Sequence, residues 1–257
     1  MEQEPRFARL RLYNLFMGFL HLAQAVFILI LTNDFTLPIT TSFVEYIPET
    51  GKLGPVTDTL INLPLGIMIA VFLLMSAIAH FTIALPRVFG WYKNNLKRGI
   101  NYARWYEYAF SASLMIVLIG MLCGLYDFAA LLMAFALTAV MNLCGLMMEV
   151  HNQTTEKTSW TSYIIGCIAG VAPWIAITVY FFGSLMTAEE SIPTFVYIIL
   201  PTLFVFFFSF ALNMALQYKK VGPWRDYLFG ERVYILLSLV AKSALAWQVF
   251  AGTLRPV

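Results

Sequence analysis

Charged residues are scarce in this chain of 257 residues: Asp, Glu, Lys and Arg make up 12% of it, against 60% hydrophobic residues. A soluble domain carries about 25% charged residues. The shortage excludes an ordinary soluble enzyme, a disordered chain and a nucleic-acid-binding protein. It favours a membrane protein with many spans and short loops. The three cysteines, Cys123, Cys144 and Cys167, all lie in apolar runs, which predicts buried free thiols and no disulfide framework.

Motifs of conventional catalysis are also missing. The sequence has no cluster of metal ligands, no glycine-rich phosphate loop and no nucleophile–base triad. We therefore expect neither a metal site nor enzyme activity. Because there is no internal repeat and no stretch long enough for a separate soluble domain, we expect residues 1–257 to form a single domain.

Long apolar runs, by contrast, are abundant. A helix needs about 20 mostly apolar residues to cross a bilayer, and seven stretches qualify. They cover residues 10–31, 61–85, 104–125, 128–149, 160–184, 193–217 and 232–253. Short breaks such as Pro86-Arg87, Glu189-Glu190 and Lys219-Lys220 predict adjacent antiparallel helices. The expected fold is an all-α bundle of seven transmembrane helices.

Lysine and arginine are distributed unevenly between the two predicted sides of the membrane. Of the 16 basic residues, 13 fall on the side of the N-terminus, two (Lys52 and Arg255) fall on the other side, and Lys242 lies within a span. Cytoplasmic loops carry an excess of positive charge. The distribution therefore predicts a cytoplasmic N-terminus and an extracellular C-terminus.

The longest predicted loop, residues 33–59, lies on the extracellular side. Two β-prone runs, Ile39–Ile47 and Lys52–Thr57, flank the turn sequence Pro48-Glu49-Thr50-Gly51. This pattern is typical of a short β-hairpin, and an irregular loop fits it equally well. A hairpin at this place is a candidate dimer contact.

Lys242 lies near the middle of the seventh span, and no other charge lies between Arg232 and Arg255. A lysine at the centre of a membrane helix costs about 2.5–3.5 kcal/mol on insertion scales. We therefore expect its side chain to face the bundle interior and to have a partner. A desolvated amine is also a nucleophile that forms a Schiff base with an aldehyde.

Glu107, near one end of the third span, is the best partner for Lys242. Glu107 and Ser111 are four residues apart, as are Ser238 and Lys242, so each helix presents an ionisable group and a hydroxyl on one face. Three interpretations fit these residues: a carboxylate that balances the charge of a Schiff base, an ion pair that only holds two helices together, and an ion-coupling site in a transporter.

Two segments narrow this choice. Retinal proteins have seven helices, with one lysine in the middle of the last helix. Residues 104–108 (RWYEY) and residues 238–248 (SLVAKSALAWQ) resemble the heliorhodopsin family. The predicted cytoplasmic N-terminus also matches that family. The resemblance covers essentially the whole chain, and the second segment is its most specific part.

The resemblance implies that Lys242 carries all-trans retinal as a protonated Schiff base and that Glu107 is its only carboxylate counterion. Ser238 replaces the aspartate that ordinary microbial pumps have one turn before the lysine, and it lies beside the Schiff base. Ser111 is placed to hydrogen-bond the counterion region. Phe206 replaces the tryptophan that ordinary rhodopsins place on the sixth helix. The rest of the retinal pocket is expected to include Met115, Met141, Asn142 and Trp174.

The resemblance also implies a polar, proton-accepting cavity on the cytoplasmic side of the Schiff base. Its expected members are His21, Gln24, Ser76, His80, Asn101 and Tyr108. Residues 113–125 and 243–253, in the outer halves of the third and seventh spans, contain no carboxylate. A proton pump would therefore lack a relay there.

The expected function is that of a light sensor in the cell membrane that isomerises retinal and signals without pumping ions. Its expected partners are retinal, membrane lipid, a second copy of the chain and an unknown cytoplasmic signalling protein. Two alternatives stay open. One is a light-driven ion transporter or channel on the same chromophore. The other is a transporter or scaffold without a chromophore, in which the Lys242–Glu107 pair is structural or couples to ions.

Overall fold

The structure of the chain is a computed structural model that describes residues 3–187 and 194–254. The predicted break at Glu189-Glu190 and Arg255 lie outside the described residues. In chain order the elements are α1 (Gln3–Leu31), β1 (Thr36–Ile47), β2 (Lys52–Pro64), α2 (Leu65–Ala84), α3 (Pro86–Lys97), α4 (Tyr102–Leu122), α5 (Phe128–His151), α6 (Thr161–Thr187), α7 (Thr194–Tyr218), the 3-10 turn η1 (Gly222–Arg225), α8 (Tyr227–Val249) and the π-helical turn η2 (Phe250–Leu254).

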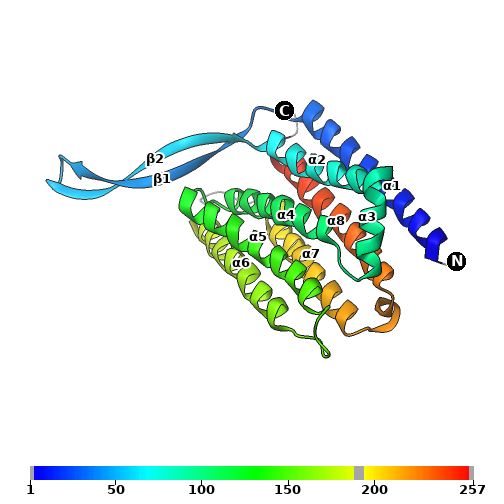
Figure 1. Cartoon of the computed structure of the whole chain (residues 1–257). Coiled ribbons are helices and arrows are strands. Elements are labelled where there is room, and N and C mark those ends of the chain that lie inside the picture. The colour runs from blue at the N-terminus through cyan, green and yellow to red at the C-terminus, as the bar shows by residue number, and fades with distance from the viewer. Residues whose placement is uncertain (1–2, 188–193, 255–257) are drawn as a thin grey trace.

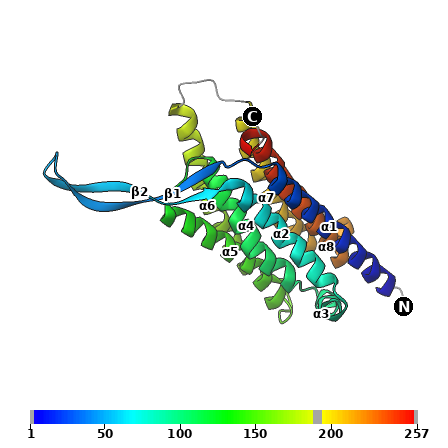
Figure 2. The same ribbon diagram turned by 90° about the horizontal axis from the view of Figure 1, so that it is seen from above.

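Seven of these helices are long and apolar enough to cross a membrane, namely α1, α2 and α4 to α8. The predicted seven-helix bundle is therefore confirmed, and the chain is a multi-pass integral membrane protein. Neighbours in the sequence pack closely in the pairs α1–α2, α4–α5, α5–α6 and α7–α8, and α1 also contacts α8 (Figure 2). Of the seven spans, α4 has the largest buried share, so it lies at the centre of the bundle.

The helix α3 was not predicted, because its residues belong to a basic segment that resembles a loop in composition. It begins at Pro86, whose fixed φ suits the first turn of a helix. One face is buried through Tyr92 and Leu96, whereas Arg87 and Trp91 are exposed. The helix is therefore amphipathic and covers one end of the bundle.

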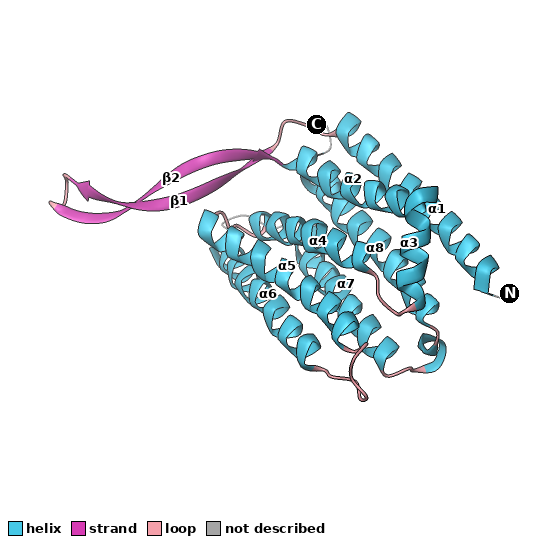
Figure 3. Cartoon of the chain, in the orientation of Figure 1, coloured by secondary structure: helices cyan, strands magenta, loops and turns pink. Residues whose placement is uncertain are grey.

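The predicted hairpin is confirmed, and it is longer than expected. Strands β1 and β2 pair antiparallel from Thr36↔Pro64 to Ile47↔Lys52, with the turn at residues 48–51. The predicted second span begins too early, because residues 61–64 continue β2 and α2 starts at Leu65. Figures 1 and 3 show the hairpin as an arm that extends away from the helices. Its role as a dimer contact stays a prediction.

Side-chain caps determine where the helices that carry the candidate site begin. The Asn101 side chain accepts a hydrogen bond from the backbone N–H of Arg104 at 3.0 Å, which starts α4. The Asp226 side chain accepts one from the N–H of Leu228 at 3.2 Å, which starts α8. Such caps satisfy backbone donors that a helix leaves free in its first turn. They fix the register of Glu107 on α4 and of Lys242 on α8.

The bundle has two different ends. We call the end with the hairpin and η2 the hairpin end. The other, which we call the basic end, holds the start of α1, the helix α3, the α5–α6 connection and η1 (Figure 1). The 13 basic residues predicted to share one side fall at the basic end. The largest apolar cluster fills the hairpin half of the bundle and includes Met115, Ile116 and Trp174.

Candidate functional site

Lys242 and Glu107 meet in the interior of the bundle. The Lys242 ammonium donates hydrogen bonds to Glu107 Oε1 at 3.1 Å and to Ser238 Oγ at 2.9 Å. Its side chain is 3% exposed and that of Glu107 is 10% exposed. The structure therefore brings together the three residues that the sequence places on the inner faces of the third and seventh spans. A buried lysine of this kind needs a carboxylate, because an unpaired charge in an apolar interior is very costly.

Glu107 has a second donor on another helix. The hydroxyl of Ser76 on α2 donates to Glu107 Oε1 at 2.7 Å. The Lys242 nitrogen also lies 5.1 Å from the centre of the Tyr108 ring, a cation–π distance. Ser111 is fully buried close by, and its hydroxyl oxygen has no hydrogen-bond partner among the described residues. The pair is thus held from α2, α4 and α8 together.

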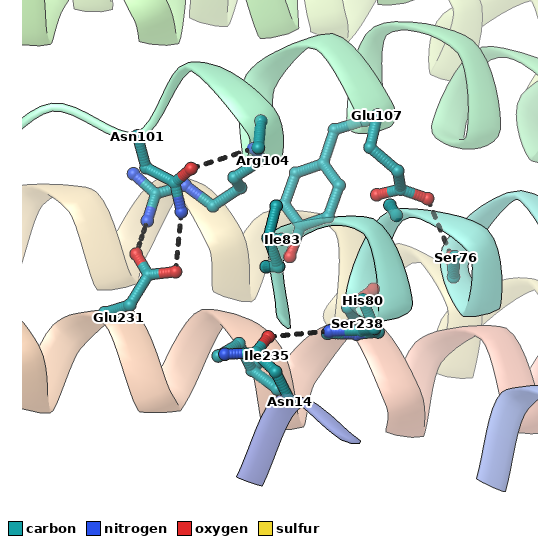
Figure 4. A pocket seen from close by; sticks show the side chains of 13 residues that line it. Asn14, Ser76, His80, Ile83, Asn101, Arg104, Glu107, Glu231, Ile235 and Ser238 are labelled. Carbon is teal, nitrogen blue, oxygen red and sulfur yellow. Dashed lines mark hydrogen bonds and ion pairs between the residues drawn. The ribbon is translucent and has the colours of Figure 1, made fainter. Parts of the chain in front are cut away.

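A polar cavity of about 40 Å³ begins at Glu107 and extends toward the basic end of the bundle (Figure 4). This volume accommodates more than one water molecule, since each needs about 10–15 Å³. Four of the six predicted cavity residues line it, namely Ser76, His80, Asn101 and Tyr108. Asn14, which was not predicted, lines it too, and its Oδ1 lies 2.8 Å from His80 Nδ1.

The other two predicted cavity residues lie elsewhere. His21 is fully buried and stacks on His80, with ring centres 5.6 Å apart, and neither of its ring nitrogens has a hydrogen-bond partner among the described residues. Gln24 is not a lining residue of the cavity. Its Oε1 accepts a hydrogen bond from Trp247 Nε1 at 3.0 Å. His21 is therefore one layer behind the cavity wall, and Gln24 serves a different contact.

The residues predicted to complete the retinal pocket differ in their burial and contacts. Met115 and Trp174 are buried in the apolar cluster beside α4. Asn142 is buried as well, and its amide donates to the carbonyl of Thr138 at 2.9 Å, within its own helix. Met141 is half-buried and lies against Gly170.

Phe206 is half-buried, and its neighbour Phe207 packs on the apolar cluster. The Phe207 ring contacts Trp174 edge-to-face, with ring centres 5.3 Å apart. Phe204 makes a similar contact with Trp174 at 5.4 Å. The aromatic neighbours of Trp174 on α7 are therefore Phe204 and Phe207, and neither was predicted as a pocket residue.

A second buried charge cluster, centred on Arg104, was also missed. Its guanidinium forms ion pairs with Glu231 on α8 and with Glu149 on α5, and all three side chains are at most 4% exposed. We call these three residues the Arg104 cluster. All three lie near helix ends, and the sequence analysis predicts no contact among them. The helix α3 and the turn η1 lie at this end of the bundle, and neither was predicted from the sequence.

The two carboxylates of the Arg104 cluster are well supplied with donors. Glu231 Oε1 accepts from Asn101 Nδ2 at 2.6 Å and from Tyr92 Oη at 3.1 Å. Burial and the neighbouring Glu231 carboxylate raise the pKa of Tyr92 on α3 well above its usual value, so this phenol stays a neutral donor.

The Glu149 carboxylate also accepts several hydrogen bonds. It accepts from Trp105 Nε1 at 2.6 Å, from the backbone N–H of Asn101 at 2.9 Å and from Tyr227 Oη at 3.0 Å. Arg104 also lies over the Tyr234 ring, 4.0 Å from its centre. The cluster therefore ties α4, α5 and α8 together.

One signal in the sequence could have revealed this cluster. Glu231, Tyr234, Ser238 and Lys242 follow one another at spacings of three, four and four residues, so they share one helix face. Arg104 and Glu107 are likewise one turn apart on α4. Arg104, Glu107, Glu231 and Ser238 all line the same cavity (Figure 4).

Comparison with known proteins agrees with this geometry. The sequence model of the heliorhodopsin family matches residues 10–254. The fold is similar to that of a light-driven proton pump from Leptosphaeria maculans, with a TM-score of 0.62 and 16% sequence identity over 91% of this chain and 93% of that chain. At this identity the likeness shows the fold alone. No curated protein sequence matches the chain.

The Arg104 cluster leads to a prediction about stability. We expect Arg104→Gln to lower the free energy of unfolding by about 3–5 kcal/mol, because two buried carboxylates would lose their shared cation. Thermal and denaturant unfolding of the purified protein measure this change.

Arg232→Gln is the matched control. Arg232 is exposed, and its contact with Asp226 is 4.0 Å long, so its loss should change stability by less than about 1 kcal/mol. Equal effects of the two substitutions would show that the cluster does not stabilise the fold.

Proposed function

The chain belongs to the heliorhodopsin family, and on that premise we propose that it is a light sensor that changes conformation on illumination and does not pump ions. Membership of a rhodopsin family implies a retinal chromophore and membrane embedding. The observation that carries the proposal is the buried Lys242–Glu107 pair, with its 3.1 Å contact inside a seven-helix bundle.

The residues around this pair fit a retinal bound to Lys242. A primary amine is buried beside a carboxylate, which suits a charged imine in an apolar interior. Buried Met115 and Trp174 offer apolar and aromatic walls. Between α5 and α6 a Cβ on Gly170 would lie 2.3 Å from the Met141 sulfur. Methionine is flexible, so this part of the wall adapts to a ligand.

When bound, retinal supplies the absorption of visible light and a change of shape on isomerisation. The protein's residues have separate tasks. Lys242 Nζ would hold the chromophore through a Schiff base, and the Glu107 carboxylate would balance the positive charge. Ser76 and Ser238 orient these groups through their hydroxyls. The pocket residues Met141, Asn142 and Phe206 stay predictions.

The proton-holding groups lie toward the basic end. His80 Nδ1 is hydrogen-bonded to Asn14 Oδ1, which leaves the other ring nitrogen, Nε2, for a proton. His21 stacks on the same ring, and histidine exchanges protons near neutral pH more readily than other side chains. We propose that the cavity beside Glu107 receives the Schiff-base proton and returns it by the same route.

The placement of carboxylates argues against pumping. A pump needs an acceptor and a donor on opposite sides of the Schiff base. Glu107 and Glu231 line one cavity that extends from Glu107 toward the basic end, whereas residues 113–125 and 243–253 contain no carboxylate. Proton exchange would therefore take place on one side only. The concentration of basic residues at that end supports its placement in the cytoplasm.

A light-gated channel on the same chromophore is the second candidate. The polar cavity between Glu107 and Glu231 favours it, because a channel needs a hydrated path more than a donor. In either case the proposed partners are a second copy of the chain and a cytoplasmic protein that reads the conformational change.

Retinal binding is tested with the purified protein and all-trans retinal. We expect a visible absorption band that is absent in Lys242→Ala, because the amine that forms the Schiff base is gone. Lys219→Ala is the control, since Lys219 is exposed at the end of α7, and it should keep the band. A wild-type protein without any visible band would contradict the proposal.

Pumping is tested by illuminating a cell suspension that contains the retinal-loaded protein. We expect no light-induced change of external pH and no steady photocurrent, while flash spectroscopy of the same sample shows a photocycle. A pH change that an uncoupler abolishes would indicate pumping, and a passive photocurrent would favour the channel.

A further inference from the structure

A second, larger cavity opens at the basic end, separate from the one beside Glu107. Its volume is about 480 Å³, within the range of about 300–1,000 Å³ that is usual for small-molecule sites. The end of α3, the α5–α6 connection, the end of α7 and η1 form its walls. We call it the basic-end cavity.

Four basic side chains line the basic-end cavity, namely Lys97, Arg98, Lys220 and Arg225, against one acidic side chain, Glu156. Lys97 lies 3.8 Å from Glu4. Arg98, Lys220 and Arg225 form no ion pair among the described residues. Basic residues at this end also fit the distribution of charge across the membrane. That rule does not explain why three unpaired cations line one partly open cavity.

The backbone conformation of Lys220 also indicates that this lysine has a functional role at the cavity. Lys220 lies two residues beyond the end of α7 in the left-handed conformation, with φ 54°, and it is the one described non-glycine residue with a positive φ. Glycine is the usual residue in this conformation just after a helix, because any other side chain is strained there. A lysine at this position places its charge at the cavity at some cost in stability, as is common for functional residues.

The cavity also carries aromatic groups and borders the Arg104 cluster. Tyr218, Trp224 and Tyr227 are lining residues. The Trp224 ring nitrogen donates to Asn213 Oδ1 at 2.6 Å, and the Tyr227 hydroxyl donates to Glu149 Oε1 at 3.0 Å. These bonds hold the rings rigidly, so a flat ligand group would meet a preformed wall.

We propose that the basic-end cavity binds a phosphate-bearing small molecule of nucleotide size. Phosphate matches the unpaired cations, because arginine binds its oxygens in bidentate fashion and lysine adds a point charge. The aromatic wall suits a planar base. The same phosphate chemistry occurs in lipid headgroups, which are a second source of the ligand. The site does not depend on retinal.

The first experiment titrates the full-length protein with inorganic pyrophosphate and with ADP. The protein is held in phosphatidylcholine nanodiscs, and calorimetry measures binding. We expect saturable binding at one site, and we expect Arg98→Gln combined with Lys220→Gln to weaken it about tenfold or more. Arg9→Gln combined with Arg87→Gln removes the same charge from exposed residues outside the cavity. This control pair should change the affinity by less than about threefold.

Lys220→Gly separates binding from folding. Glycine suits the left-handed conformation, so we expect an unchanged or higher unfolding temperature together with weaker pyrophosphate binding. Nanodiscs that contain phosphatidic acid distinguish the two sources of phosphate. A lipid headgroup in the cavity would compete with pyrophosphate and weaken its binding. In the Arg98→Gln, Lys220→Gln protein this effect of the lipid should disappear. Absence of saturable binding in both kinds of nanodisc, or an equal loss in the control pair, would overturn the proposal.

Discussion

An ammonium group buried among membrane helices must have a carboxylate beside it, and the arrangement of the bundle follows from this requirement. Lys242 is 3% exposed, and its partner Glu107 lies on α4, the most buried span. The serines of α2 and α8 complete the hydrogen bonds of the pair. Three helices are therefore fixed around one amine, and the same geometry makes that amine suitable for carrying a charged imine.

The helices α4 and α8 are joined twice, with the charges exchanged. Near the middle of the membrane α4 supplies the carboxylate of Glu107 and α8 the lysine, whereas at the basic end α4 supplies Arg104 and α8 the carboxylate of Glu231. A small polar cavity connects the two clusters. This asymmetry places the polar and charged groups of the cavity on one side of Lys242, and the proposal of a sensor that does not pump ions rests on it.

Much of this could be predicted from the sequence, because membrane spans and helix faces follow local patterns. The seven spans, the hairpin turn and the meeting of Lys242 with Glu107 depend on apolar length, turn residues and four-residue spacing. The Arg104 cluster depends on tertiary packing at the basic end, so its ion pairs could not be predicted from local patterns. Two further contacts also depend on tertiary packing. Gln24 turns toward Trp247. Phe207 contacts Trp174, but it lies in a run of aromatic residues, and the sequence does not show which of them makes this contact.

We propose that Glu107, and no other carboxylate in its cavity, balances the charge on the Lys242 nitrogen. The most direct measurement compares the visible spectra of retinal-loaded Glu107→Gln and Glu231→Gln at neutral pH. Both substitutions remove one carboxylate from the same cavity and keep the shape of the side chain. We predict that Glu107→Gln shifts the visible band or replaces it with the near-ultraviolet band of a neutral imine, while Glu231→Gln leaves it in place. An unchanged band in Glu107→Gln, or a larger shift in Glu231→Gln, would contradict the account.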